Sequence, residues 1–193
     1  HVVIDEEKYN KGEKYLLVKD VLIALQQLAK YHRQQLKIPV LGITGSNGKT
    51  TSKELISAVL SKKYNTYATK GNLNNHIGVP LTLLSIRPEH EFAVVEMGAN
   101  HVGEIAMLCD LALPDHGLIT NIGRAHLEGF GGPKGVIKAK NELYQFIGFA
   151  KGKLFVNADN ELLMNLSRSI NKITYGTSSA DYCGEVADIN PFV

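Results

Sequence analysis

The chain has 193 residues, of which 44% are hydrophobic and 21% are charged, a composition typical of a globular protein that can bury a sizeable core. A formal net charge of +2 with interspersed signs provides no basic stripe, so we expect no nucleic-acid partner. The two cysteines, Cys109 and Cys183, form no metal-binding or redox motif. No apolar run approaches the ~20 residues of a membrane span, and no signal peptide is evident, so we expect a cytoplasmic protein.

The chain opens with a segment that is expected to be extended over residues 1–18. From Asp20, a residue type common at helix N-caps, apolar residues recur at helical spacing and stop near Leu36, which predicts a helix leading into the main domain. The chain starts with His1 rather than Met and stops without a closing helix. We therefore expect an excised part of a longer protein.

Short apolar strands then alternate with helices. In chain order we expect a strand over 40–44, a helix over 50–64, a strand over 65–69, a helical stretch over 79–86, a strand over 92–97, a helix over 102–112, a strand over 117–122, a helix over 135–149, a strand over 153–157, a helix over 161–169 and a strand over 172–176. This alternation predicts an α/β fold with a mostly parallel sheet covered by helices on both faces. Because ligands bind at the carboxyl ends of such strands, we expect the site among residues 45–51, 96–101 and 121–126.

The segment LGITGSNGKTTSKEL, residues 41–55, joins the first of these strands to a helix through a glycine-rich turn. The backbone N–H groups of such a turn and the helix dipole favour a phosphate, Lys49 can reach the outer phosphates, and the Thr50 hydroxyl can ligate Mg²⁺. The usual spacing is G-x-x-x-x-G-K-T, but Ile43 occupies the leading position here, so the motif is a shortened variant. The alternative is a glycine turn that merely lets a helix pack closely against its sheet.

Two further polar residues follow the ends of predicted strands. Glu96 ends an apolar strand at the edge where the phosphates are expected, and its carboxylate can bind Mg²⁺ directly or through water. A solvated strand end is the alternative for Glu96. His126 lies just beyond another strand end, where a histidine can serve in a site or simply form a hydrogen bond, so the sequence alone leaves its role open.

One lysine is predicted to lie on the apolar face of a helix. At 100° per residue along the helix over 135–149, Lys140 is centred among apolar side chains, whereas Lys138 points almost the opposite way, near Glu142 and Gln145. A charge in a buried stripe is costly unless it is paired, neutralised or chemically altered. The alternative is that the long stem carries the ammonium to the rim of the sheet.

Several ordered motifs resemble the Mur ligases, namely TGSNGKTTSKE, GNLNNHIGVPLTLL, VVEMGANHVGEI, TNIGRAHLEGFG and KAKNELY. The resemblance covers residues 38–175 and implies the P-loop NTPase-like central domain of that family. It further implies that residues 1–36 are the tail of an N-terminal substrate domain with a linker helix. Residues 37–193 are then a truncated central ATP-binding domain, and the C-terminal domain of the family is absent.

Within the family, the asparagine-rich stretch and EMGANH are most similar to the branch that adds D-alanyl-D-alanine to UDP-N-acetylmuramoyl-tripeptide. The resemblance implies a monomeric amide ligase of peptidoglycan synthesis that uses ATP and Mg²⁺ and works through an acyl phosphate. The fragment alone is expected to be inactive. The rival interpretations are a nucleotide-driven switch or motor, which needs no buried lysine, and a non-catalytic fragment.

The same resemblance implies roles for individual residues. The expected contacts to ATP come from Gly45, Ser46, Asn47, Gly48, Lys49, Thr50 and Thr51. The expected catalytic residues are Lys49, His126 and Lys140, and the expected metal ligands are Thr50, Glu96, His126 and Lys140. Lys140 matches the lysine that the family carries as a carbamate, which would replace a costly buried ammonium by an anionic oxygen ligand. Asn74 and Asn75 are expected near the transferred phosphate and the substrate carboxylate, although either could merely stabilise a turn.

Overall fold

The computed structural model describes residues 1–123 and 127–185. Its strands are β1 (Val2–Ile4), β2 (Tyr15–Leu17), β3 (Val40–Thr44), β4 (Thr66–Ala68), β5 (Phe92–Glu96), β6 (His116–Ile119), β7 (Lys153–Asn157), β8 (Lys172–Gly176) and β9 (Tyr182–Cys183). Its α-helices are α1 (Val21–Gln35), α2 (Lys49–Leu60), α3 (Gly78–Leu84), α4 (Glu104–Ala112), α5 (Leu127–Phe130), α6 (Pro133–Phe149) and α7 (Glu161–Leu166). A short 3-10 helix, η1, spans Glu7–Tyr9.

Seven strands form the main sheet in the order β4-β5-β3-β6-β7-β8-β9, and every pairing in it is parallel. The predicted α/β fold with a parallel sheet is therefore confirmed. The central strand β3 is buried along its whole length, as its apolar sequence VLGIT requires of a strand covered on both faces. In register, Ile43 lies beside Glu96 of β5 and Thr44 beside Ile119 of β6, so the carboxyl ends of the three central strands meet at one edge.

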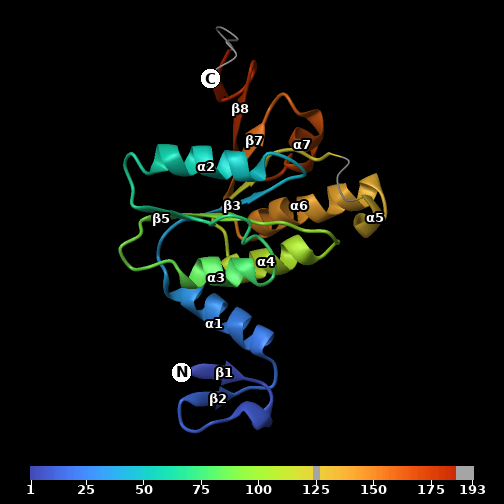
Figure 1. Ribbon diagram of the computed structural model, residues 1–193. Coiled ribbons are helices and arrows are strands. Elements are labelled where there is room, and N and C mark those ends of the chain that lie inside the picture. Colours follow the sequence, from blue (N-terminus) through green and yellow to red (C-terminus); the bar gives the residue numbers. More distant parts are fainter. Residues whose placement is uncertain (124–126, 186–193) are drawn as a thin grey trace.

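Helices α3, α4 and α6 pack on one face of the sheet, and α2 lies on the other, as Figure 1 shows. The first face carries the larger core cluster, which α7 joins through Leu163. On the second face the cluster is built around Leu41 and Ile43, and α2 is the one described helix that contributes to it. The predicted cover on both faces is therefore only partly realised. An open apolar groove of about 430 Å³ runs beside α2 over β6, β7 and β8.

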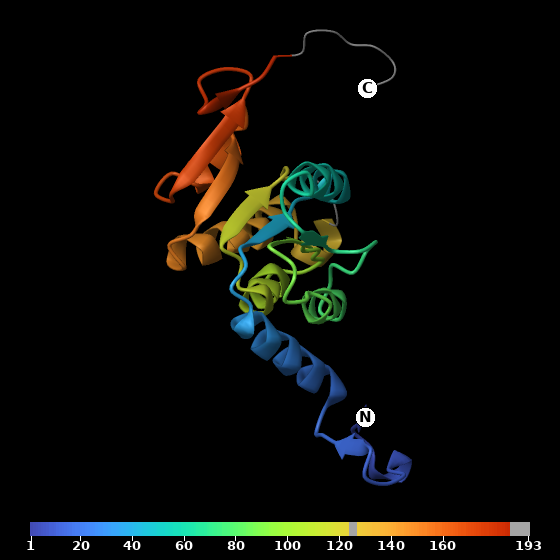
Figure 2. The ribbon, with the colours of Figure 1, turned by 90° about the vertical axis from the view of Figure 1, so that its left-hand side faces the viewer.

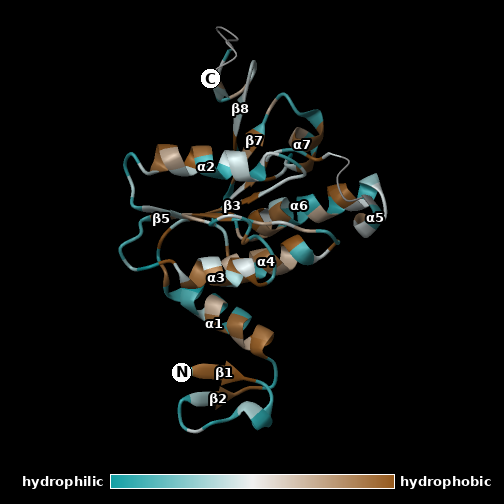
Figure 3. Ribbon diagram, viewed as in Figure 1, coloured by the Kyte–Doolittle hydropathy of each residue, from teal (hydrophilic) through white to brown (hydrophobic). Residues whose placement is uncertain are grey.

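The helix α1 leads away from the sheet toward the separate pair of parallel strands β1 and β2 (Figures 1 and 2). It packs on α3 and α4 rather than on the sheet. Hydrophobic and hydrophilic residues alternate along α1 and α2 in Figure 3, as expected of helices with one packed side. Asp20 caps the N-terminus of α1 as predicted, because its side chain accepts a hydrogen bond of 2.8 Å from the backbone N–H of Ile23.

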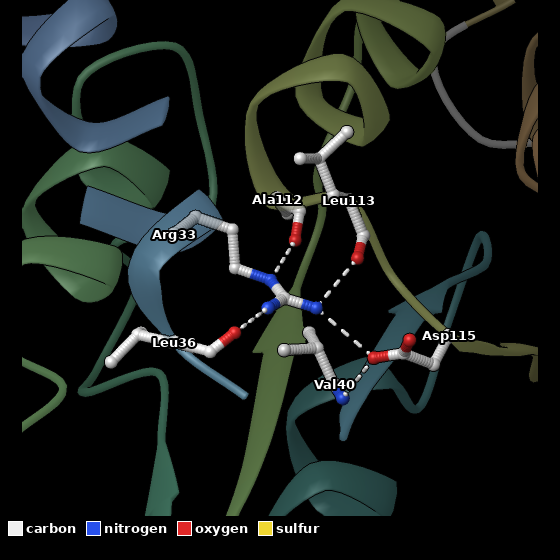
Figure 4. Close-up of polar contacts among 6 residues, drawn as sticks. All are labelled: Arg33, Leu36, Val40, Ala112, Leu113 and Asp115. Atoms are coloured by element: carbon white, nitrogen blue, oxygen red, sulfur yellow. Dashed lines mark hydrogen bonds and ion pairs between the residues drawn. The ribbon is translucent and has the colours of Figure 1, made fainter. Parts of the chain in front are cut away.

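A buried arginine joins the end of α1 to the end of α4 and the residues that follow it (Figure 4). The Arg33 guanidinium donates to the backbone carbonyls of Ala112 at 2.8 Å, Leu113 at 2.9 Å and Leu36 at 3.1 Å. It also pairs with Asp115 Oδ2 at 3.0 Å, and the same oxygen accepts the N–H of Val40 at 2.8 Å. The hydrogen bonds of Arg33 and Asp115 therefore link the end of α1 to the end of α4 and the start of β3.

Several predicted boundaries differ from the observed ones. The helix predicted over 50–64 ends at Leu60, where residues 61–64 continue as turns, and the strand predicted over 117–122 ends at Ile119. The 3-10 helix η1 and the edge strand β9 were not predicted, because each is too short to show a period. Among the helices of the described residues, none combines the length and the apolar character needed to cross a membrane.

Candidate functional site

The site lies at the edge of the sheet where β3, β5 and β6 end. The loop between β3 and α2 turns sharply there, because Gly45 has φ +151° and Gly48 has φ +74°. A Cβ atom at Gly45 would lie 2.0 Å from the Thr120 hydroxyl oxygen, so the close approach of the loop to β6 requires glycine. The predicted glycine-rich turn is therefore present, and Lys49 begins the helix that follows it.

The residues that follow β6 hold this loop by backbone and side-chain contacts. Asn47 and Asn121 are paired reciprocally: the Asn47 N–H donates to Asn121 Oδ1 at 3.1 Å, and Asn121 Nδ2 donates to the Asn47 carbonyl at 3.0 Å. The Thr120 hydroxyl donates to the same carbonyl at 2.7 Å. The Ser46 hydroxyl accepts the N–H of Gly123 at 2.9 Å. Asn121 lies in the segment 121–126 where the site was expected, but neither its pairing with Asn47 nor the role of Thr120 was predicted, since these contacts exist only once β6 lies beside β3.

Lys49 curls back over the loop that precedes it. Its ammonium donates to the carbonyls of Gly45 at 2.9 Å and Ser46 at 3.3 Å. Burial lowers the pKa of Lys49, and the nearby carboxylate of Glu96 partly offsets this effect. Thr51, which was expected to contact the nucleotide, is exposed on the first turn of α2.

Glu96 is almost fully buried, with 1% of its surface exposed. Its Oε1 accepts the Thr50 hydroxyl at 3.2 Å and Asn74 Nδ2 at 2.9 Å, while its backbone N–H donates to the Thr69 hydroxyl at 3.0 Å. The alternative of a solvated strand end is therefore wrong for Glu96. Its Oε2 is buried without a hydrogen-bond partner in the described residues.

The two asparagines of the predicted site play different parts. Asn74 contacts Glu96 directly, whereas Asn75 Oδ1 accepts the backbone N–H groups of Ile77 at 3.0 Å and Gly78 at 2.9 Å. Asn75 therefore stabilises the entry into α3, the turn role that the sequence left open for it. Both residues nevertheless line the same cavity.

A cavity of about 210 Å³ lies beside the phosphate loop. Its lining combines the phosphate loop, the asparagine segment, the end of β5 and the α5–α6 region: Gly45, Ser46, Lys49, Asn74, Asn75, Gly98, Ala99, Asn100, Phe130 and Lys140. The structure thus brings Lys49 and Lys140 to one space from positions 91 residues apart in the chain.

Lys140 is only 3% exposed, and it lines the cavity at the edge of the sheet rather than projecting from the surface as a solvated lysine. Its Nζ lies 5.4 Å from the centre of the Phe130 ring. Burial, assisted by the charge of Lys49, lowers the pKa of Lys140 to about 8, while Glu104 and Glu142 oppose the shift. Lys138 is exposed, as predicted.

Glu142, which the helical projection places near the exposed Lys138, does not share its exposure. Glu142 is buried, and its two carboxylate oxygens accept the backbone N–H groups of Gly103 at 2.7 Å and Ala106 at 2.9 Å. These groups belong to the start of α4, where the helix dipole favours a negative charge. A helical projection of α6 alone could not show that α4 would be its neighbour on that side.

The oxygen donors at this edge fit Mg²⁺. The Thr50 hydroxyl and the Glu96 carboxylate lie within hydrogen-bond distance of each other, and Glu96 Oε2 accepts no hydrogen bond from the described residues. Mg²⁺ prefers such oxygen ligands and usually completes its coordination with waters and phosphates rather than with a cage of side chains. Residues 1–123 and 127–185 contain no group of three His, Cys, Asp or Glu placed to hold a metal. His126, the other expected ligand and catalytic residue, lies outside the described residues.

Comparison with known proteins identifies close relatives. The family model for the Mur ligase middle domain matches residues 43–191. The UDP-N-acetylmuramoyl-tripeptide--D-alanyl-D-alanine ligase of Synechocystis is 44% identical over 190 residues, which cover 96% of this chain and 42% of the relative. The ligase of the same name from Escherichia coli is 44% identical over 172 residues, covering 86% of this chain and 38% of the relative.

Solved structures show the same likeness. The MurF ligase from Thermotoga maritima in complex with ADP matches with a TM-score of 0.82 at 30% identity, over 93% of this chain and 42% of that one. MurF from Acinetobacter baumannii matches with a TM-score of 0.77 at 41% identity, over 84% of this chain and 36% of that one. The chain thus spans about two fifths of the length of the relatives that it matches.

Proposed function

The chain belongs to the Mur ligase family, and from that premise we propose that it is the nucleotide-binding part of a ligase that joins D-alanyl-D-alanine to UDP-N-acetylmuramoyl-tripeptide. Residues 1–36 act in this proposal as the tail of a substrate domain and its linker helix, and residues 37–193 belong to the ATP-binding domain. The observation that carries the proposal is the meeting of the phosphate loop, Glu96 and Lys140 at one edge of the sheet.

The reaction consumes one ATP. The terminal carboxylate of the tripeptide attacks the γ-phosphorus, the bond to the β-phosphate oxygen breaks, and ADP leaves with that electron pair. The amine of D-alanyl-D-alanine then attacks the acyl phosphate carbon, inorganic phosphate departs, and the amine loses a proton as the amide forms. Because a free carboxylate is a poor electrophile, phosphorylation supplies the leaving group that amide formation needs.

The phosphate loop binds and orients the nucleotide in this proposal. Turning the Lys49 ammonium from the carbonyls of Gly45 and Ser46 toward the phosphates exchanges two neutral acceptors for anionic ones, which are stronger partners. Thr50 and Glu96 hold Mg²⁺, which neutralises charge on the phosphates when it is bound. Asn74 keeps the Glu96 carboxylate turned toward the loop by its hydrogen bond to Oε1.

Lys140 is proposed to act as a carbamate. Its neutral amine attacks carbon dioxide, a C–N bond forms, and one proton is released, which leaves an anionic carboxylate on the side chain. A lysine whose pKa is lowered to about 8 holds far more neutral amine at pH 7 than an ordinary lysine does, so the lowered pKa favours the modification. The carbamate oxygens then supply the anionic ligand that the family resemblance assigns to this position.

Chemical rescue tests this proposal in the full-length ligase. Lys140→Ala is expected to abolish amide formation, and added formate or acetate is expected to restore part of it by placing a small carboxylate in the vacated space. Lys138→Ala is the matched control, because Lys138 is exposed on the same helix and is expected to lose little activity. An essential Lys138 together with a replaceable Lys140 would contradict the assignment.

A further inference from the structure

The residue at the centre of the buried side of α2 is a lysine. Lys53 is fully buried, with no exposed surface, whereas the other residues of α2 are at least partly exposed. It is not among the residues that line the cavity beside the phosphate loop. A buried ammonium is costly unless it has a partner of opposite charge.

Two carboxylates lie near the Lys53 ammonium. Glu54 Oε1 is 3.0 Å away, but the Glu54 side chain is 66% exposed, so water screens that pair. Glu96 Oε2 is 3.8 Å away and belongs to a side chain that is 1% exposed. Attraction between two buried opposite charges is much stronger than between exposed ones, so Glu96 is the partner that matters for the burial of Lys53.

The two oxygens of Glu96 face different surroundings. Oε1 is turned toward Thr50 and Asn74, on the side of the phosphate loop. Oε2 accepts no hydrogen bond from the described residues, and Lys53 Nζ, which lies 3.8 Å from it, donates none. Lys53 is therefore the charged group that faces Oε2, while the exposed Glu54 is its second carboxylate neighbour. The ammonium is thus placed to hold one oxygen of the carboxylate while the other remains directed at the loop.

We propose that Lys53 is a positioning residue that holds Glu96 Oε2 and thereby keeps Oε1 directed at the divalent cation of the bound nucleotide. This inference rests on the proposed function, since it takes Glu96 as a ligand of Mg²⁺. If Lys53 had a purely structural role, Lys53→Met would leave Mg²⁺ binding unchanged. A methionine fills nearly the same volume as the lysine and replaces a buried charge by an apolar group.

The test is a MgCl₂ titration of fluorescent ADP binding to the full-length ligase. For Lys53→Met we expect the Mg²⁺ concentration at half-saturation to rise about tenfold, while ADP binding in EDTA stays within twofold of that of the unsubstituted protein. Glu54→Gln is the matched control, because it removes the other carboxylate near Lys53 without touching Glu96, and we expect no change above twofold. In a Glu96→Gln background, Lys53→Met should have no further effect on half-saturation.

Two results would overturn the proposal. One is a folded Lys53→Met protein whose half-saturation lies within twofold of the unsubstituted value. The other is an equal loss of ADP binding with and without Mg²⁺, which would indicate a general effect on the nucleotide site.

If Lys53→Met does not fold, thermal unfolding of the double variant Lys53→Met with Glu96→Gln decides the matter. A double variant that folds like Glu96→Gln supports the pairing, whereas a double variant that also fails to fold overturns it. If the unsubstituted ligase binds no ADP, the proposed function fails, and the same unfolding comparison still decides whether Lys53 and Glu96 are paired.

Discussion

Lys49 illustrates how a single side chain depends on the loop around it. Its ammonium is held by the carbonyls of Gly45 and Ser46, and the loop can bend back far enough to offer them because Gly45 and Gly48 have positive φ angles. The lysine is therefore kept at the edge of the cavity, within reach of a phosphate, without being buried in the core.

Lys49→Ala in the full-length ligase is expected to lower turnover about 1,000-fold, because the proposed phosphate contact is lost where charge develops. The fold should be kept, since Lys49 lies at the edge of the sheet and is only half-buried. Lys62→Ala, just beyond the other end of the same helix and exposed, is the control and should leave turnover within twofold. Initial rates of amide formation measure both, and normal turnover in Lys49→Ala would exclude the phosphate role.

The lowered pKa of Lys140 predicts how stability depends on pH. The folded protein releases this proton near pH 8, whereas the unfolded chain keeps it up to about pH 10.5, so the unfolded state binds more protons between these values. The contribution of Lys140 to the free energy of unfolding should therefore increase as the pH rises from 8 to 10.5.

Lys140→Met should remove that contribution. Urea denaturation in buffers free of carbon dioxide, at intervals between pH 8 and 10.5, gives the free energy of unfolding of both proteins. The difference between the unsubstituted protein and Lys140→Met should shift in favour of the unsubstituted protein as the pH rises. A difference that stays constant over this range would show that the pKa of Lys140 is not lowered.

At the scale of elements, α4 and α6 are joined by a charge at a helix end. The Glu142 carboxylate of α6 accepts two backbone N–H groups at the start of α4, where Gly103 supplies no capping side chain of its own. The contact orients α6 on the sheet, and with it Lys140, which lies half a turn earlier on the same helix.

Glu142→Gln is expected to destabilise the protein by about 1–2 kcal/mol, because the amide keeps one acceptor oxygen but turns its donor NH₂ toward a backbone N–H. Gln145→Ala, exposed on the same helix, is the control and should change the free energy of unfolding by less than about 0.5 kcal/mol. Chemical denaturation measures both variants. Equal stability of Glu142→Gln and the unsubstituted protein would mean that the capping contact contributes nothing.

At the scale of the whole molecule, the hydrogen bonds of Arg33 fix the position of α1 against α4 and the sheet that carries the site. Burial lowers the pKa of Arg33, and the carboxylate of Asp115 opposes this. The guanidinium satisfies three backbone carbonyls that end α1 and α4, which are groups that a helix end cannot satisfy internally.

Arg33→Met is expected to lower the free energy of unfolding by about 2–4 kcal/mol, because it leaves three backbone carbonyls at helix ends without their side-chain donor and removes the ion pair with Asp115. Amide hydrogen exchange should increase most over α1. Lys30→Met is the matched control, since its ion pair with Asp110 joins the same two helices at an exposed position and is expected to contribute under about 1 kcal/mol. Unchanged exchange in α1 of Arg33→Met would show that other contacts hold the helix.

Local patterns in the sequence were sufficient for much of the fold. The strand VLGIT, the helix that begins at Lys49 and the helix that bears Lys140 were predicted because apolar periodicity and glycine positions depend on neighbours within a few residues. The α/β class and the placement of the site at the carboxyl ends of the strands followed from their alternation. The burial of Lys140 followed from the phase of its own helix.

Contacts between distant segments were decided only by the tertiary structure. Nothing in the sequence near Glu142 indicates that α4 begins beside it, and nothing near Asn121 indicates that it pairs with Asn47, because these partners are separated by 36 residues or more. The ion pair between Lys53 and Glu96 is likewise a contact between distant segments that the sequence alone does not show. A single sequence records which residues can be buried or charged, but the partner of a buried charge depends on strand order and register, and these are determined when the whole core packs.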